Sequence, residues 1–120
     1  MQRKDLVEKI ANSIDARDAK LFSEFITEDG IFRFGNAEDV KGRKNIEDYV
    51  AAFFGMIKGS SHRIINLWDD GNNIVWQGEV EYTRLDEKKV NVKFVNIFKM
   101  EGDMIRDYLI YIDNAPLFAA

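Results

Sequence analysis

The sequence has no cysteine, only one proline and only one histidine among its 120 residues. Without cysteine the chain cannot form a disulfide, a thiolate metal site or a cysteine nucleophile. The single histidine, His62, also excludes a multi-histidine metal site within one chain. We expect no metal and no organic cofactor. A chain without cysteine fits a reducing compartment, and we expect a cytoplasmic protein.

Long hydrophobic runs and an excess of one charge are missing as well. No apolar stretch approaches the roughly 18 residues that a membrane-spanning helix requires, and the N-terminal segment is amphipathic, without the apolar centre of a signal peptide. The 17 basic and 21 acidic residues are interspersed and give a net charge of −4. We therefore expect neither a membrane nor nucleic acid as a partner.

The length predicts a single domain over residues 1–120, large enough for a substantial core. Hydrophobic residues at helical spacing predict three helices, over residues 5–16, 18–26 and 43–57. Alternation with a period of two predicts five strands, over residues 30–34, 62–68, 73–84, 90–100 and 103–113. The resulting order, α-α-β-α-β-β-β-β, is that of an α+β domain.

Residues 90–113 have the most regular pattern and predict a long β-hairpin. Glu101-Gly102 is the expected two-residue turn, because glycine accepts the positive φ that such turns need. This turn places Asn96 directly across from Asp107. An amide and a carboxyl would then meet on a face otherwise made of Phe, Val, Leu and Tyr side chains.

Asp107 is therefore the leading candidate for an acid or base. A carboxylate on an apolar face loses hydration unless it is hydrogen-bonded, and its pKa tends to rise. Asn96 would orient Asp107 or polarise a ligand oxygen. A purely structural carboxyl, tied to Asn96 or to a tyrosine hydroxyl, is the alternative, and the sequence leaves both interpretations open. The expected ligand contacts are Phe34, Phe53, Trp76, Tyr82, Phe94, Phe98, Leu109 and Tyr111.

Other polar residues have simpler interpretations. Glu79 and Glu81 alternate with Val80 and Tyr82, so they are expected on the solvent or interface side of the sheet. His62 begins a predicted strand beside a Gly-Ser loop, where a surface or capping histidine is expected.

The element order, together with VKGRKNIEDYV at the third helix and IRDYLIYIDNAPLF near the end of the chain, resembles the nuclear transport factor 2-like superfamily. Within it the chain is most similar to the SnoaL-like polyketide cyclase and ketosteroid isomerase branch. The resemblance implies a cone, in which a curved and mostly antiparallel sheet wraps around three helices. It also implies an apolar pocket at the open end and a homodimer formed through the sheet.

The resemblance also bears on the site. Arg106-Asp107-Tyr108 resembles the Arg-Asp-Tyr step in the last strand of limonene epoxide hydrolase-like proteins, where the aspartate belongs to the active site. The oxyanion-stabilising aspartic acid of ketosteroid isomerases falls on Asn96. The Arg-x-Asp that the hydrolases carry on their central long strand has no counterpart in this chain.

We therefore expect a protein that binds a small apolar molecule in the cone. Cofactor-free acid/base chemistry through Asp107, of isomerase, cyclase or epoxide-hydrolase type, is one hypothesis. A non-catalytic ligand-binding or dimeric assembly module of the same fold is the other. An open cavity would favour the first and a cone filled by its own side chains the second.

Overall fold

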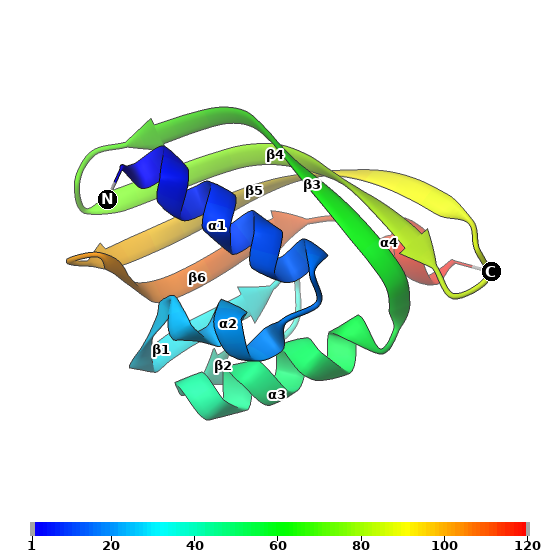
Figure 1. The fold of residues 1–120 in the computed structure, drawn as a ribbon, viewed down its shortest axis with the longest axis horizontal. Coiled ribbons are helices and arrows are strands. Elements are labelled where there is room, and N and C mark those ends of the chain that lie inside the picture. The colour runs from blue at the N-terminus through cyan, green and yellow to red at the C-terminus, as the bar shows by residue number, and fades with distance from the viewer. Residues whose placement is uncertain (1, 120) are drawn as a thin grey trace.

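In the computed structural model, which describes residues 2–119, a curved sheet wraps around helices from the N-terminal half of the chain (Figure 1). The helices are α1 (Arg3–Asp15), α2 (Ala19–Glu24), α3 (Arg43–Phe54) and the short α4 (Ala115–Phe118). The strands are β1 (Ile26–Phe34), β2 (Val40–Lys41), β3 (Ile57–Asp69), β4 (Asn73–Arg84), β5 (Lys89–Glu101) and β6 (Met104–Ile112). This arrangement confirms the predicted α+β cone.

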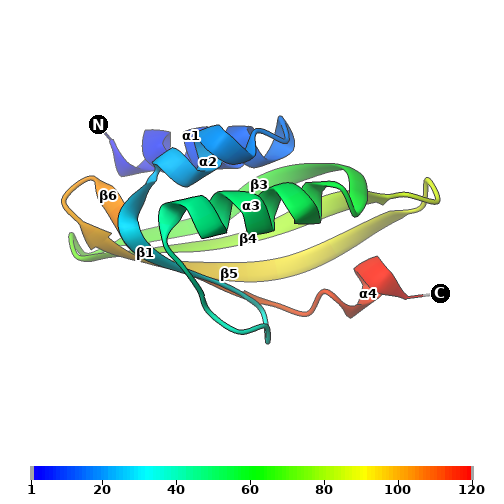
Figure 2. The same cartoon turned by 90° about the horizontal axis from the view of Figure 1, so that it is seen from below.

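The six strands form one sheet in the order β2-β1-β6-β5-β4-β3. All neighbours are antiparallel except β1 and β6, which run parallel. α1, α2 and α3 lie on the same side of this sheet (Figure 2). No helix within residues 2–119 is long and apolar enough to cross a bilayer.

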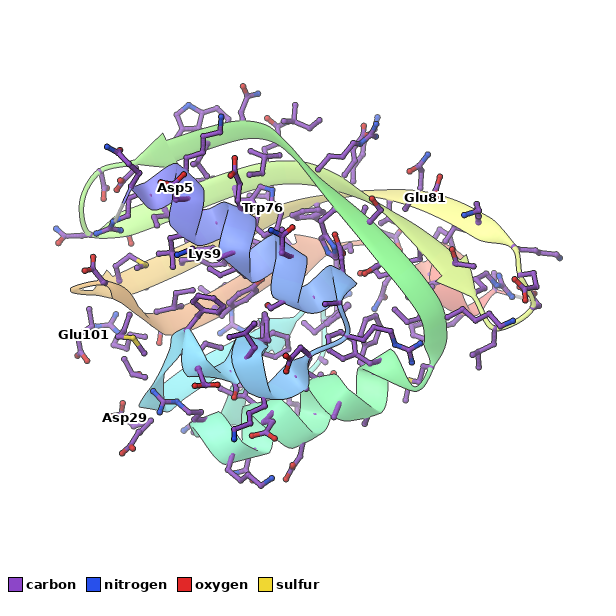
Figure 3. All side chains as sticks on the ribbon, in the orientation of Figure 1. Asp5, Lys9, Asp29, Trp76, Glu81 and Glu101 are labelled. Carbon is purple, nitrogen blue, oxygen red and sulfur yellow. The ribbon has the colours of Figure 1, made fainter. Side chains whose placement is uncertain are left out.

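The core lies between these helices and the inner face of the sheet. α1 contributes Leu6, Val7 and Ile10, which recur at helical spacing and are at most 5% exposed. Asp18 caps α2 by accepting a hydrogen bond from the Leu21 amide at 3.0 Å. On the sheet side, Trp76 is fully buried and lies within the body of the molecule, whereas Glu101 lies at its edge (Figure 3).

The β5–β6 hairpin differs from the prediction at its turn. The two loop residues are Gly102 and Asp103, because Glu101 pairs with Met104. Gly102 has a φ of +61° and takes the first loop position, where a two-residue turn of type II′ prefers glycine. The predicted turn placed the same glycine in the second position.

A β-bulge then changes which side chains of β6 face the helices. Met100 pairs with Ile105, but Lys99 pairs with Asp107, so Arg106 is one extra residue on β6. A shift of one residue moves every later side chain to the opposite face. Tyr108 therefore points inward and Asp107 outward.

The predicted pairing of Asn96 with Asp107 is wrong for this reason. Asn96 pairs with Ile110 instead. Compared with the predicted hairpin, the observed turn shifts the β5–β6 register by two residues, which leaves each side chain on its predicted face. The bulge shifts the register by one more residue, which moves the side chains beyond it to the opposite face. Periodicity alone cannot reveal this bulge, because residues 108–112 are all apolar or aromatic and their types do not show which of them face inward.

Gly30 gives the bulge room on the neighbouring strand. The β1–β6 register also shifts, between the pairs of Ile26 and Ile31. A Cβ added at Gly30 would lie 2.4 Å from Cγ2 of Ile26 and 3.0 Å from the carbonyl oxygen of Arg106. Because Gly30 has no side chain, β1 can pack closely against Arg106, the extra residue of β6.

Smaller differences concern element boundaries. β3 begins at Ile57 and runs through Gly59-Ser60-Ser61, which the sequence predicts as a loop. Pairing of Gly59 with Thr83 and of Ser61 with Glu81 extends the ladder through these residues, so tertiary pairing overrides their turn propensity. β2 and α4 are also absent from the predicted order, since two and four residues are too few to show a period.

Gly30→Ala should lower the free energy of unfolding by about 1–3 kcal/mol, because the added methyl group overpacks the contact between β1 and the bulge. Urea denaturation followed by circular dichroism measures the change. Gly59→Ala is the matched control, since a Cβ there meets nothing within 4 Å. Equal stability of the two variants would contradict a tight fit at Gly30.

Candidate functional site

An apolar cavity lies between the inner face of the sheet and the helices. Its volume is about 40 Å³, enough for a few water molecules. Tyr49, Phe53 and Ile112 on its wall are partly exposed, so the cavity borders solvent. The wall consists of Ile14, Phe22, Phe32, Phe34, Tyr49, Val50, Phe53, Phe54, His62, Tyr82, Phe94, Asn96, Tyr108, Ile110 and Ile112.

The predicted contact residues divide into three groups. Phe34, Phe53, Tyr82, Phe94 and Asn96 line the cavity. Trp76 and Phe98 are fully buried in the core but are not part of the cavity wall. Leu109 and Tyr111 lie on the outer face of the sheet, opposite Ile97 and Val95, so their predicted inward orientation is wrong.

Asp107 lies outside the cavity. Its side chain is 18% exposed on the outer face, and its Oδ2 accepts a hydrogen bond from Nη2 of Arg106 at 3.3 Å. Across the strands it is opposite Lys99. The apolar surroundings that motivated an acid/base role for Asp107 are therefore replaced by two cationic neighbours.

Asn96 is on the cavity wall and is 3% exposed. Its Nδ2 donates a long hydrogen bond, 3.5 Å, to the hydroxyl oxygen of Tyr108. Its Oδ1 is buried and has no hydrogen-bond partner among residues 2–119. Asn96 and Tyr108 thus form a polar pair within a mostly apolar wall.

The strongest polar interaction at the cavity joins His62 to Asp15, which ends α1. Nδ1 of His62 lies 2.5 Å from Oδ1 of Asp15, and the backbone amide of His62 donates to Oδ2 at 2.9 Å. The hydroxyl of Ser60 donates to Oδ1 at 2.8 Å. One carboxylate therefore binds the imidazole and the strand that carries it.

Rings enclose the imidazole of His62, whose side chain is only 7% exposed. The ring centroids of Trp76, Tyr82 and Phe94 lie 5.9, 6.3 and 5.7 Å from that of His62. Gly78 makes this packing possible, since a Cβ there would lie 2.6 Å from Cζ of Phe94. The histidine is thus held in an apolar setting rather than at the surface, where the sequence predicts it.

The electrostatics of the pair follow from its surroundings. Burial raises the pKa of Asp15, but the hydrogen bonds and charge of His62 and the hydroxyl of Ser60 outweigh burial and hold that pKa below its usual value of 3.8. Asp15 is therefore ionised at neutral pH. Burial and, to a smaller extent, the charge of Asp15 raise the pKa of Tyr82, which keeps its proton.

The tautomer of His62 follows from this contact. A carboxylate accepts hydrogen bonds, so Nδ1 of His62 carries the proton that faces Asp15. In the neutral imidazole, Nε2 then has the free lone pair, and no residue between 2 and 119 forms a hydrogen bond with it. Nε2 is the atom available to accept a proton.

Sequence reasoning missed this pair because its members are 47 residues apart. One local signal was available. An acidic residue in the last turn of a helix opposes the helix dipole, and Asp15 is the last residue of α1. Such a conflict indicates a tertiary role. Among the described residues, no group of three or more His, Asp and Glu is arranged to hold a metal ion.

The Asp15 carboxylate should make stability depend on pH. Because its pKa is lower in the folded than in the unfolded chain, its contribution is complete above about pH 4 and is lost as the pH falls through its folded pKa. The difference in unfolding free energy between wild type and Asp15→Asn should therefore shrink on acidification from about pH 6 to about pH 3. Urea denaturation at several pH values tests this, with Asp103→Asn in an exposed turn as control. A pH-independent difference would contradict the assignment.

Comparisons with known proteins support this description of the fold. Residues 7–108 match the SnoaL-like domain family. None of the curated proteins compared with the chain matches it. Among solved structures, a nuclear transport factor 2-like protein of unknown function from Burkholderia pseudomallei superposes with a TM-score of 0.87 at 14% identity, over 98% of this chain and 96% of that chain.

Two further structures have names that indicate activities. An LEH-like epoxide hydrolase from M. tuberculosis has a TM-score of 0.77 at 15% identity, covering 93% of this chain and 83% of that chain. A putative SnoaL-like polyketide cyclase from Jannaschia sp. CCS1 has a TM-score of 0.76 at 16% identity, covering 93% and 88%. At these identities the likeness concerns the fold. With the family match over most of its length, the chain belongs to the SnoaL-like domain family, within the nuclear transport factor 2-like fold.

Proposed function

We propose that this protein binds a small, largely apolar molecule in its cavity and transfers protons on it, with His62 as the general base and acid. The observation that carries the proposal is the 2.5 Å contact between His62 and Asp15 on the wall of an aromatic cavity. The family match supports it, since isomerases, cyclases and epoxide hydrolases share this fold.

The proposed chemistry needs only the side chains of this chain. Nε2 of the neutral His62 removes a proton from the substrate or from water, and the imidazolium that forms is stabilised by the Asp15 carboxylate. Asp15 is a positioning residue, because it fixes the tautomer and orientation of the imidazole. Return of the proton to another atom completes an isomerisation or a ring closure, and proton removal from water would start a hydrolysis.

The aromatic wall supports this role of His62. In a cavity with little water, the attraction between an imidazolium and a carboxylate is stronger than in bulk solvent. The position of Asp15 at the end of α1 keeps the carboxylate on the far side of the imidazole from its free nitrogen. The arrangement is therefore suited to a proton transfer in which Nε2 of the imidazole takes up a proton and returns it.

A non-catalytic binding or assembly module of the same fold is the alternative. The observation that favours it is the small cavity volume of about 40 Å³, which leaves little space unless side chains such as Phe53 move. Native mass spectrometry of the purified protein tests for a retained ligand. A cavity that stays empty against a panel of small apolar compounds would favour the alternative.

His62→Gln should reduce turnover by about 10²–10⁴-fold, because the variant has no side chain that takes up a proton at this position. Asp15→Asn should reduce it less, since the imidazole remains. Deuterium uptake from D₂O into small ketones and hydrolysis of small epoxides, followed by mass spectrometry, provide the assays.

The Asp107→Asn variant tests whether the acid/base group is His62, as proposed here, or Asp107, as the sequence alone suggested. We expect little change in turnover, because Asp107 faces outward beside Arg106. Full activity of His62→Gln with loss of activity in a folded Asp107→Asn would reverse the assignment. Thermal unfolding of each variant shows whether the fold is intact.

We also propose that the outer face of the sheet forms a homodimer. Ile65 and Tyr111 on this face are 51% and 53% exposed, and Val95 between them is partly buried. These three residues border one shallow groove with Glu79 and Lys93. An apolar groove with charges of both signs suits a symmetric contact between two copies of the chain.

Tyr111→Glu should shift the protein toward the monomer, because a symmetric interface would bring two new negative charges together. Sedimentation velocity at several concentrations measures the effect. Leu85→Glu is the control, since Leu85 is 59% exposed at the β4–β5 turn and away from the groove. A wild type that is monomeric at high concentration would refute the proposed dimer.

A further inference from the structure

Asn96 and Tyr108 are polar groups that the proton transfer at His62 does not use. Both line the cavity, and they are only 3% and 1% exposed. Tyr108 is held in place by the rings of Phe98, Phe22 and Phe32, whose centroids lie 4.4, 5.1 and 5.4 Å from its own. A buried polar pair in so rigid an aromatic setting requires hydrogen-bond partners.

The hydrogen-bond capacity of the pair is only partly used. Nδ2 of Asn96 donates to the Tyr108 hydroxyl oxygen, which leaves the hydroxyl proton of Tyr108 available. No residue between 2 and 119 accepts that proton. Oδ1 of Asn96 is buried without a donor in the same part of the chain. Besides the second N–H of Asn96, the pair therefore offers one donor, the Tyr108 proton, and one acceptor, Oδ1 of Asn96, on the cavity wall.

Burial also keeps the donor intact. It raises the pKa of Tyr108 far above neutral pH, with a smaller contribution from Tyr82, so the phenol retains its proton. The tyrosine is therefore a neutral donor at neutral pH.

We propose that Asn96 and Tyr108 form a subsite for a hydroxyl group of the ligand, so that the cavity selects small alcohols, phenols or enols over ketones and hydrocarbons of the same size. This inference rests on the proposed function, since it assumes a ligand in the same cavity as His62.

A hydroxyl group matches both free positions. Its oxygen accepts the proton of Tyr108, and its own proton is donated to Oδ1 of Asn96. A ketone satisfies Tyr108 but leaves Oδ1 without a donor, and a hydrocarbon leaves both groups unpaired. Selectivity of this kind arises because a ligand without the hydroxyl leaves a buried polar group of the site unpaired.

The opposite orientation of the Asn96 amide has a different consequence. Tyr108 would then donate to Oδ1, and the two N–H groups of Nδ2 would be left for the ligand. Such a site has two N–H donors and, as its only acceptor, the weaker phenol oxygen of Tyr108, so it prefers a ketone to an alcohol of the same size. The relative affinity for these two ligands therefore distinguishes the orientations.

Cyclohexanol, cyclohexanone and methylcyclohexane are suitable probes, since they differ little in size. Each is larger than the cavity of about 40 Å³, so its entry requires a wall side chain such as the partly exposed Phe53 to move. Binding is measured by titration of backbone amide chemical shifts in two-dimensional NMR. We expect wild type to bind cyclohexanol about tenfold more tightly than cyclohexanone, which corresponds to one hydrogen bond.

Variants test whether Asn96 and Tyr108 cause the preference for the alcohol. Asn96→Leu and Tyr108→Phe should each abolish it, whereas Tyr82→Phe should retain it, because Tyr82 lines the cavity but forms no bond with Asn96. Replacing both members with apolar residues of similar shape should preserve the fold, so the double variant Asn96→Leu/Tyr108→Phe guards against a loss that is due to unfolding.

Each result supports or overturns the subsite. Equal affinity for alcohol and ketone would overturn it and assign the pair to a bound water, which donates and accepts in the same way. A preference for the ketone, or a preference that survives in Asn96→Leu, would overturn it too. These outcomes leave the proton transfer at His62 untouched. Failure of all three probes to bind would instead overturn ligand binding in the cavity, and the subsite with it.

Discussion

One extra residue at Arg106 decides what the interior of this protein contains. Because successive side chains of a strand point to opposite faces, the extra residue moves every side chain of β6 beyond it to the other face. Tyr108 is buried against the helices as a result, and the carboxyl of Asp107 is left outside, next to Arg106. The cavity wall, the Asn96–Tyr108 pair and the charged outer face all depend on this local irregularity and on the space that Gly30 leaves for it.

Most of the fold could be predicted from periodicity. The three helices of the N-terminal half and the long strands β4 and β5 have enough residues to show their period, and their ends lie close to the expected positions. Gly59-Ser60-Ser61 were misassigned because pairing with β4, rather than local propensity, makes them a strand. The bulge at Arg106 could not be predicted for a different reason, since no residue type marks its position in the sequence.

The candidate site was less predictable than the fold. Phe34, Phe53, Tyr82, Phe94 and Asn96 line the cavity as their strand and helix phases indicated. The Asp15–His62 pair joins the end of α1 to β3, and such contacts between distant segments leave no trace in spacing. Only the unfavourable position of an acid at a helix C-terminus pointed to it. The sequence thus predicted the apolar wall better than the ionisable group within it.

The attachment of Asp15 has a consequence for control of the protein. β3 is an edge strand, and the carboxylate that ends α1 binds a hydroxyl, a backbone amide and an imidazole of that strand together. Lifting the end of α1 from the sheet would break all three bonds in one event and free the imidazole to rotate. Docking of α1 and orientation of the His62 imidazole therefore form a single cooperative unit. Under the proposed function, a partner that competes for α1 would stop the proton transfer without entering the cavity.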